Sequence, residues 1–504
     1  MPKKLSAFIN SITMYRLVLY GLLALVGNAL VASNLGLIPY SLSQILWSLL
    51  VLSGLSHIFN RLLAKIFTCP TNAESATITS LILFFLFAPS SNFSGLFTLS
   101  VASLVAIASK FIISSRHAHL FNPAAIAAVL LPLFGFEAAL WWVATPALLP
   151  LTIIVGLLVV YKTKRNALLT AFWLSSILTI TYANWRFIDS WLGFGSELLL
   201  SWPLVFFSTI MLTEPLTMPP TRKLQIYYGL LVGLFFGLPF HFGLVYSSPE
   251  LALVLGNFMA FFVSGKKTLF LTLLHKEQLA NNIYEFVFRS SAPLRFQAGQ
   301  YLEWTLTPKT PDSRGNRRFF TIASAPTETE IKVGVKVPSQ ASSFKQELLQ
   351  LQPGENIFAS QLAGDFILPS DPSEKIVMIA GGIGITPFRS QIKYLLDKQE
   401  HRDVVLIYSA SRWQELVYQE LWQEATKKIG LKLIQLCSGS AENLPKNWPG
   451  KMGRVTSKLI RDEISDWRER IFYLSGPSAL VDDYKALLEK LGVKKIVTDY
   501  FPGF

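Results

Sequence analysis

The pattern of apolar residues changes abruptly near Lys266, and this change constrains the fold more than any other feature of the chain. Residues 16–263 form a succession of long apolar runs, such as 17–31 and 153–161, whereas short alternating segments and amphipathic segments follow from residue 268 onward. A mean hydropathy of +0.41 and 51% apolar residues exceed the values of ordinary soluble proteins. We therefore expect an all-α polytopic membrane bundle over residues 1–265, followed by a soluble part with β-strands and helices.

The apolar runs predict ten membrane spans. They lie at about residues 16–34, 42–60, 76–89, 94–112, 121–135, 145–161, 166–183, 202–214, 225–243 and 249–264. Several are shorter than the ~20 residues that cross a bilayer squarely. We expect these to be broken or half-spanning helices inside the bundle, because backbone at membrane depth has to be shielded from lipid.

The distribution of basic residues predicts the orientation. With ten spans and the N-terminus inside, 14 of the 15 Lys and Arg residues before residue 268 fall on the inner side, and Arg186 alone falls outside. This asymmetry indicates a multi-pass protein of the bacterial inner (cytoplasmic) membrane with both termini in the cytosol. Topology thus accounts for the net charge of +13, so membrane lipid is the expected partner and nucleic acid is not.

Cysteine and histidine usage argues against a metal centre. The chain has two cysteines, Cys69 and Cys437, whereas an iron–sulfur cluster needs four protein ligands. The six histidines show no paired helical spacing that would hold a haem between spans. We expect no metal site.

A short motif in the soluble part suits a flavin. Arg318, Phe320 and Thr321 follow one another on an expected strand, and they offer a planar fork for a diphosphate, a ring for stacking and a hydroxyl near the flavin N5. Ser342 and Ser343 precede a helical run over 345–350, where hydroxyls and free amides at a helix N-terminus suit a second phosphate contact.

A glycine-rich turn suits a dinucleotide. An apolar strand over 375–380 runs into Gly381-Gly382-Ile383-Gly384-Ile385-Thr386-Pro387 and then into a helix that reaches about residue 396. Glycines let the backbone approach a pyrophosphate, which then faces the helix N-terminus. Residues 404–410, 431–436 and 471–475 are expected to add further parallel strands.

Residues 268–504 resemble the ferredoxin–NADP reductase superfamily, whose members join an FAD-binding antiparallel β-barrel (here 266–372) to an NAD(P)-binding α/β domain (here 373–504). The resemblance rests on the motif at 318–321, the turn at 381–387, Ser475-Gly476-Pro477 and the terminal Asp499-Tyr500-Phe501. It implies FAD binding by Arg318, Phe320, Thr321, Ser342 and Ser343, NADH or NADPH binding by Gly382, Gly384, Thr386, Gly476 and Pro477, and catalytic roles for Thr321, Ser475 and Phe501, the last as a lid over the flavin ring.

Two departures from that family matter. Ser475 stands where the family often has cysteine, so hydride transfer is expected to be tuned differently. The family's 2′-phosphate site usually has a Ser-Arg pair, but residues 437–440 contain no arginine, although Ser411-Arg412 follows the preceding strand. This favours NADH and leaves NADPH open.

Three polar segments interrupt the apolar part, at 71–79, 119–125 and 211–217. They contain Glu74, Asn122 and Glu214, and buried acids and amides at membrane depth usually face a cavity. One interpretation is helix capping, with Pro123 as a first-turn proline. The other is that helix N-termini after Glu74 and Asn122 attract a phosphate or an anionic ring.

Phe121-Asn122-Pro123-Ala124 and Thr213-Glu214-Pro215-x-Thr217 make residues 15–265 similar to the RnfD/NqrB membrane flavoproteins, in which FMN is attached to a Thr in Asp-x-x-Ser-Gly-Ala-Thr. Here only Ala144-Thr145 survives of that motif. Thr145 is therefore either an attachment site for FMN or a helix N-cap before Pro146, and the N-cap is favoured. A non-covalent flavin, FMN or riboflavin, is expected near Glu74, Asn122 and Glu214.

Together these features predict a membrane-bound oxidoreductase that passes electrons from NAD(P)H through FAD to a membrane flavin or quinone. Further redox subunits or a soluble electron acceptor are candidate partners. The alternative is a transporter for an ion or a flavin-like solute that the fused reductase drives or regulates. A haem-dependent transmembrane reductase is a third class, and the histidine pattern argues against it.

Overall fold

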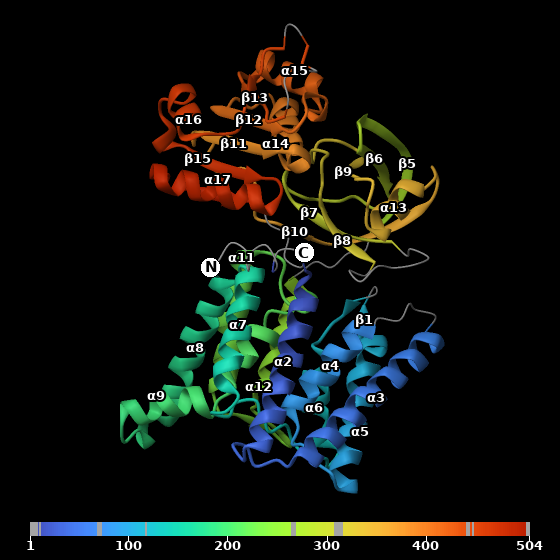
Figure 1. Ribbon diagram of the computed structural model, residues 1–504, viewed down its shortest axis with the longest axis vertical. Helices are drawn as coiled ribbons and strands as arrows, with labels where there is room; N and C mark the ends of the chain where they lie inside the picture. The colour runs from blue at the N-terminus through green and yellow to red at the C-terminus, as the bar shows by residue number, and fades with distance from the viewer. Residues whose placement is uncertain are drawn as a thin grey trace. The chain divides into compact units, whose positions relative to one another are not determined.

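The computed structural model describes residue 9 and residues 12–67, 73–115, 118–263, 269–306, 316–439, 444–445 and 448–499 (Figure 1). It forms two compact units, a helical unit within Met1–Gly265 and a reductase unit within Lys266–Phe501. Each is described by itself.

The helical unit contains two- to seven-turn helices joined by short connections. They are α2 (Met14–Asn34), α3 (Leu42–Ile66), α4 (Ala73–Leu86), α5 (Phe93–Ile112), α6 (Pro123–Leu133), α7 (Leu149–Thr163), α8 (Asn166–Asn184), α9 (Trp191–Leu200), α11 (Arg222–Gly237) and α12 (Pro249–Val263), with the single turn α10 (Leu204–Phe206) continuing into the π-helix η2 (Phe207–Met211). Small hairpins are formed by β1 (Ser114–Ser115) with β2 (Ala118–His119) and by β3 (His241–Phe242) with β4 (Val245–Tyr246).

Side-chain caps start several of these helices where the sequence supplies Ser, Thr or Asn. Ser41 and Gln44 form a reciprocal capping box at the start of α3. Asn122 caps α6 by accepting from the Ala125 N–H at 3.1 Å, with Pro123 at the first helical position. The capping interpretation of Asn122 is therefore confirmed.

Helix length separates the expected spans into two groups. Within the described residues, four helices are long and apolar enough to cross a membrane, namely α2, α3, α5 and α8 with its 3₁₀ extension to Phe187. A fifth candidate is the pair Trp191–Leu200 and Leu204–Met211, which is bent by 55°. The shorter apolar helices α4, α6, α7 and α12 have 14, 11, 15 and 15 residues. Each expected run contains a helix, but the prediction of ten spans is not confirmed.

The structure corrects the interpretation of Thr145 as an N-cap. Helix α7 begins at Leu149, its cap residue Leu148 makes no side-chain bond, and Pro150 rather than Pro146 lies in its first turn. Thr145 lies in the preceding turn, where its carbonyl accepts from the Leu148 and Leu149 N–H groups. The sequence pattern places the cap three residues too early because turn residues continue up to the helix.

The reductase unit begins with a six-stranded antiparallel sheet. Its strands are β5 (Leu269–Ala280), β6 (Ile283–Ser290), β7 (Tyr301–Thr305), β8 (Arg317–Thr321), β9 (Ile331–Lys336) and β10 (Asn356–Ala363), in the order β8-β7-β10-β5-β6-β9. The two outermost strands approach each other beyond β8, where the Ala323 N–H donates to the Lys332 carbonyl at 2.8 Å. Helix α13 (Ser343–Gln350) packs Phe344 and Leu348 against the core of this sheet.

A six-stranded parallel sheet follows. Its strands are β11 (Ile376–Gly381), β12 (Val404–Ala410), β13 (Lys432–Cys437), β14 (Lys451–Met452), β15 (Ile471–Ser475) and β16 (Ile496–Thr498), in the order β14-β13-β12-β11-β15-β16. Side chains alternate between two cores: Met378 lies with α14 (Thr386–Lys398) and α15 (Gln419–Ile429), and Ile379 with α16 (Ser457–Glu463) and α17 (Ser478–Leu491). Helices thus cover both faces, and the order reverses direction between β11 and β15.

A buried ion pair joins the two sheets. Arg389 on α14 is 7% exposed, donates to the Ala323 carbonyl at 3.1 Å and binds both carboxylate oxygens of Glu328, which lies between β8 and β9. Burial alone would raise the pKa of Glu328, but hydrogen bonds from Arg389 outweigh it and hold that pKa below its ordinary value. The pair fixes α14 against the antiparallel sheet.

Replacing Arg389 by Met should destabilise the reductase unit by about 3 kcal/mol, because a buried carboxylate loses its main partner. We expect a value at the low end of the usual range, since Lys332 still reaches Glu328 at 3.2 Å. Denaturant unfolding followed by bound-flavin fluorescence measures it, and the exposed Arg461→Met is the matched control. Arg389→Met/Glu328→Met should recover part of the loss; equal stability of Arg389→Met and wild type would contradict the role.

Candidate functional site

The two glycine turns of the reductase unit meet at the point where the parallel sheet reverses its order. Gly382 and Gly384 follow β11 and Gly476 follows β15, and these strands are direct neighbours. A Cβ atom on Gly384 would lie 2.5 Å from the Gly476 Cα and 2.6 Å from the Ser475 carbonyl carbon, so backbone packs directly on backbone. Gly382 adopts φ +54° and Gly476 adopts φ +153°. Ligands of open α/β sheets bind in the crevice outside the carboxyl ends at such a reversal.

Two helices begin at the same edge of the sheet. Thr386 and Pro387 open α14, and Pro477 directly precedes α17. Their N-terminal N–H groups and dipoles favour an anion such as a pyrophosphate. The structure therefore brings together all five residues expected to bind the nicotinamide dinucleotide: Gly382, Gly384, Thr386, Gly476 and Pro477.

The antiparallel sheet reaches this turn through Gly334 on β9. A Cβ atom at Gly334 would lie 2.7 Å from the Thr386 Cγ2 and 3.0 Å from the Tyr418 hydroxyl oxygen. The Tyr418 hydroxyl in turn donates to the Glu285 carboxylate on β6 at 2.8 Å. The dinucleotide turn is thus held against the sheet that carries the flavin motif.

Two of the expected flavin residues, Arg318 and Phe320, lie close to the ring of Phe344. The Arg318 guanidinium carbon lies 5.3 Å from the centre of the Phe344 ring, and the Phe320 and Phe344 rings lie 5.9 Å apart. Phe344 is in the first turn of α13, next to Ser343, and Ser342 caps that helix by accepting from the Lys345 N–H at 3.4 Å. A guanidinium, a ring and a helix N-terminus thus adjoin, as a phosphate-bearing aromatic cofactor requires, so these residues fit FAD.

Thr321 ends β8 and is buried, opposite Tyr301 of β7. Strand alternation places Thr321 out of phase with Arg318 and Phe320. Two residues further on, the chain is bound to α14 by Arg389 at Ala323 and by the Ser390 hydroxyl at the Ser324 carbonyl, 2.6 Å away. Thr321 is therefore held near the junction of the two sheets.

Sequence reasoning assigned no role to Asp499, which the structure places beside Ser475. The Ser475 hydroxyl donates to the Asp499 carboxylate at 3.0 Å, and the Asp499 N–H continues the β15–β16 pairing by donating to the Leu474 carbonyl at 2.9 Å. Burial raises the pKa of Asp499 to about 7, against an ordinary value of 3.8. A signal was present in the terminal Asp499-Tyr500-Phe501. Phe501 itself lies outside the described residues.

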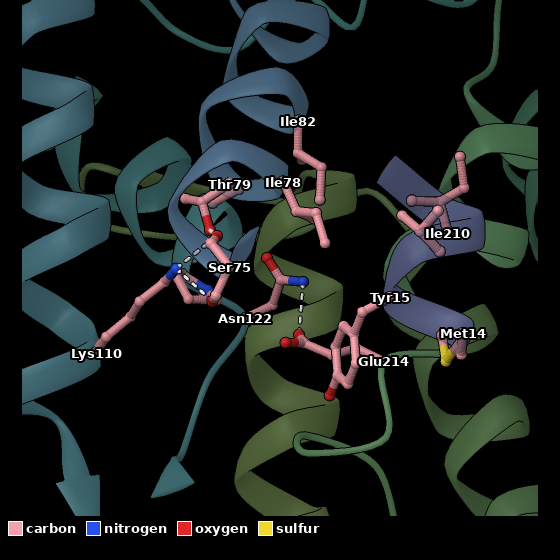
Figure 2. A pocket seen from close by; sticks show the side chains of 13 residues that line it. Met14, Tyr15, Ser75, Ile78, Thr79, Ile82, Lys110, Asn122, Ile210 and Glu214 are labelled. Carbon is pink, nitrogen blue, oxygen red and sulfur yellow. Dashed lines mark hydrogen bonds between the residues drawn. The ribbon is translucent and has the colours of Figure 1, made fainter. Parts of the chain in front are cut away.

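In the helical unit the structure brings two of the four expected residues together. The Asn122 side-chain amide donates to the Glu214 carboxylate at 2.9 Å (Figure 2). Glu74 instead faces Arg16, with 3.9 Å between the Arg16 Nε and the Glu74 Oε1 atoms. Thr145 lies in the turn before α7 and makes no hydrogen bond to Asn122 or Glu214. Its buried hydroxyl has no hydrogen-bond partner among the described residues.

Asn122 and Glu214 line a small pocket with a cavity volume of about 40 Å³. Its walls come from α2, α4, α5, α6 and η2, and Lys110 lies across from Glu214 (Figure 2). The Lys110 ammonium donates to the Ser75 carbonyl and hydroxyl, each at 3.0 Å. Sequence reasoning missed Lys110 because it reads as an inner-side positive charge at the end of a span.

Comparisons with known proteins agree with the dinucleotide site. The oxidoreductase NAD-binding domain family matches residues 378–486. The flavohemoprotein of Bacillus subtilis is 26% identical over 222 residues, which cover 43% of this chain and 54% of the relative. The glycine betaine monooxygenase reductase subunit of Chromohalobacter salexigens is 22% identical over 216 residues, which cover 42% of this chain and 57% of the relative. The chain thus spans about half the length of the curated relatives it matches.

Among solved structures, the cytochrome P450 reductase GcoB of Amycolatopsis aligns with a TM-score of 0.42 and 21% identity, covering 47% of this chain and 70% of that chain. The sequence matches and the site define the class of protein. The C-terminal part of the chain contains an NAD-binding oxidoreductase domain of the ferredoxin–NADP reductase kind, which binds FAD and NAD(P)H.

Replacing Gly384 by Ala should abolish most reduction of the bound flavin by NAD(P)H while leaving the FAD content unchanged. The added methyl group would meet the backbone of Ser475 and Gly476 at 2.5–2.6 Å, which forces the two turns apart. Stopped-flow absorbance of the flavin measures this, with a loss of at least tenfold expected. Gly54→Ala, where nothing lies within 4 Å of the new Cβ atom, is the control. Unchanged flavin reduction would show that the turns tolerate separation.

Replacing Asp499 by Asn should remove a pH dependence of stability. The folded protein holds the Asp499 proton up to about pH 7, whereas the unfolded chain releases it near pH 4, so stability is greatest at low pH and falls as pH rises through this window. The midpoint of denaturant unfolding at pH 5 and pH 8 measures it, with roughly 2 kcal/mol lost by the wild type relative to Asp499→Asn. Parallel pH profiles of the two proteins would rule out a protonated Asp499.

Proposed function

We propose that the chain is a membrane-bound flavoprotein oxidoreductase that passes electrons from NAD(P)H through FAD to a flavin or quinone bound in the helical unit. The observation that carries this proposal is that one polypeptide contains both the reductase site and a set of apolar helices that line a polar pocket. When the reductase and the acceptor site belong to one chain, their effective concentration is high, so no diffusing electron carrier is needed between the two. A further redox subunit or a soluble electron acceptor would then act only downstream of this chain.

The surface of the helical unit supports a membrane location. Leu50 and Ile58 on α3 and Leu178 on α8 are 63%, 58% and 71% exposed, and both helices are long and apolar enough to cross a bilayer. Large apolar side chains exposed on such helices would be covered by lipid tails. With basic residues gathered on one side of the expected topology, we place the chain in the bacterial inner membrane with both termini in the cytosol.

The polar sequences around Asn122 and Glu214 support an RnfD/NqrB-like helical unit. We propose that any membrane flavin, FMN or riboflavin, is held without a covalent bond. Thr145 keeps only a remnant of the attachment motif, and its hydroxyl is buried in a turn rather than displayed at a pocket.

The residues of the reductase unit account for the first half of the reaction. Bound FAD would supply the capacity to accept a hydride and to release the two electrons singly or together. The glycine turns let the backbone approach the dinucleotide, and Ser475 with Asp499 holds a proton at the strand ends where the nicotinamide is expected. With a quinone acceptor the reaction balances as NAD(P)H + H⁺ + quinone, giving NAD(P)⁺ + quinol; with a flavin acceptor the product is the dihydroflavin.

The test is a flavin inventory of the detergent-purified chain, combined with two activity assays. Acid precipitation separates free from covalent flavin, ferricyanide reports FAD reduction by NADH or NADPH, and a short-chain quinone reports transfer to the membrane acceptor. We expect one FAD per chain in the supernatant, activity in both assays, and no flavin fluorescence in the pellet.

Each other outcome has a defined meaning. Absence of FAD would overturn the proposal entirely. FAD reduction without a second flavin and without quinone reduction would favour the transporter alternative, in which the reductase drives or regulates solute movement. Fluorescence retained on the pellet would show covalent flavin and contradict non-covalent binding.

A further inference from the structure

We infer that the turn between α7 and α8 binds a phosphate group, held by Lys162, Lys164 and the first backbone N–H groups of α8. The phosphate has two sources, the headgroup of a membrane lipid or a phosphorylated solute, and the chemistry required of the site is the same for both. The lipid source rests on the membrane location in the proposed function, whereas binding of a free phosphate does not. Lys162 and Lys164 do not line the pocket at Asn122 and Glu214.

Lys162 is a buried cation without a partner. It lies in the last turn of α7 and is 3% exposed, yet it makes no hydrogen bond or ion pair within the part of the chain that the structure describes. The charged neighbour that acts on it is another cation, Lys164. A buried charge costs free energy unless an opposite charge or hydrogen-bond acceptors compensate for it. The described residues therefore leave the positive charge of this turn uncompensated.

The helix dipoles do not supply the missing negative charge. The carbonyl end of a helix attracts a cation within its last turn, which is the ordinary reason for a lysine at such a position. Here the chain turns at Lys164, in the left-handed conformation with φ +53°, and α8 begins two residues later at Asn166. The positive N-terminus of α8 thus adjoins the C-terminus of α7 and opposes its field.

The first turn of α8 offers backbone donors to a ligand. The N-cap residue of this 19-residue helix is Arg165, which makes no side-chain cap bond. Its guanidinium instead donates to the Thr213 carbonyl at 3.0 Å and so holds the turn against the loop after η2. An uncapped N-terminus combines backbone N–H groups with a positive dipole, which together favour a phosphate. The tetrahedral oxygens of a phosphate can accept from these groups and from an ammonium at once.

A second helix brings positive charge to the same end of the helical unit. Gly229 of α11 packs against Leu168 near the start of α8, and Gly237 packs against Thr179 further along it. The two helices therefore run side by side in the same direction and begin at the same end. The first two residues of α11, at 222–223, are basic and exposed there. Clusters of basic residues beside membrane helices attract anionic headgroups.

The test uses the full-length chain in detergent with Lys162→Met, and Lys162→Arg as the charge-conserving variant. Lys65→Met, which removes an exposed lysine in the last turn of α3, is the matched control. The midpoint of thermal unfolding, followed by tryptophan fluorescence, is measured while short-chain phosphatidylglycerol or inorganic phosphate is added. Chloride keeps the ionic strength constant. A ligand that binds only the folded chain raises this midpoint.

Without added ligand, Lys162→Met should unfold at a higher temperature than the wild type, because methionine removes a buried and uncompensated charge. With the ligand that stabilises the wild type, this advantage should disappear. The ligand concentration for half of the stabilising effect should rise roughly tenfold in Lys162→Met, as expected for the loss of one charge-assisted hydrogen bond. Lys162→Arg and Lys65→Met should respond as the wild type does.

The two ligands distinguish the sources of the phosphate. A response to phosphatidylglycerol alone identifies a lipid headgroup, and a response to inorganic phosphate identifies a site that also takes phosphorylated solutes. If neither ligand raises the wild-type midpoint above that in chloride, the inference is wrong. It is equally wrong if Lys162→Met responds to the ligand at the wild-type concentration.

Two further results keep the inference and the proposed function apart. If the wild type does not reduce ferricyanide with NAD(P)H, the proposed function fails, while the phosphate titration still tests this site. If Lys162→Met does not fold, Lys164→Asn removes the second charge at a position where asparagine tolerates the left-handed conformation. It should weaken the response to the same ligand, and a wild-type response in Lys164→Asn would then overturn the inference.

Discussion

The buried ion pair between Arg389 and Glu328 is the interaction on which the reductase site depends. The dinucleotide turn belongs to the parallel sheet and the flavin motif to the antiparallel sheet, so the chemistry requires a fixed angle between two separate cores. Arg389 supplies it by binding both oxygens of Glu328 and the Ala323 carbonyl. A hydrophobic contact could hold the same surfaces together, but it would not fix their register, because apolar packing is less directional than a bidentate guanidinium–carboxylate pair. Because Gly334 has no side chain, Thr386 can approach the antiparallel sheet at this position.

In the helical unit, separate elements are likewise held in position by one buried residue, but that residue is uncharged. Asn257 bonds to the start of α6, to the loop after η2 and to the Tyr228 hydroxyl on α11, at 2.9, 3.2 and 2.9 Å. A charged group in that position would carry a large desolvation cost, whereas an amide satisfies both a donor and an acceptor role in an apolar environment. The result is that the short helix α6 begins at a polar pocket although most of its length is buried among apolar side chains.

Much of the reductase unit could be predicted from the sequence because its signals are local. Strands β12 and β15 have the predicted bounds, β11 and β13 agree to within a residue, and the glycine turn lies between a strand and a helix as its pattern requires. The long-range pairs could not be predicted: nothing near Ser475 in the sequence indicates that its hydroxyl donates a hydrogen bond to Asp499, and nothing near Arg389 indicates that it pairs with Glu328. In the helical unit, hydropathy located the helices but not their lengths, since α6 ends after 11 residues with Pro132 inside it. Lys110 was counted toward topology, because a sequence shows the charge of a residue and not which wall of a pocket it occupies.

The two sites share one electrostatic design. In the reductase unit, α14 and α17 begin beneath the glycine turns; in the helical unit, α4 and α6 begin at the pocket. Helix N-termini offer fixed positive potential that needs no mobile side chain and no reorganisation when charge arrives. Each site then adds one group that can hold or oppose charge, Asp499 beside Ser475 and Lys110 beside Ser75. In the helical unit, however, the Glu214 carboxylate lies in the same pocket as the Lys110 ammonium, so the two charges offset each other there.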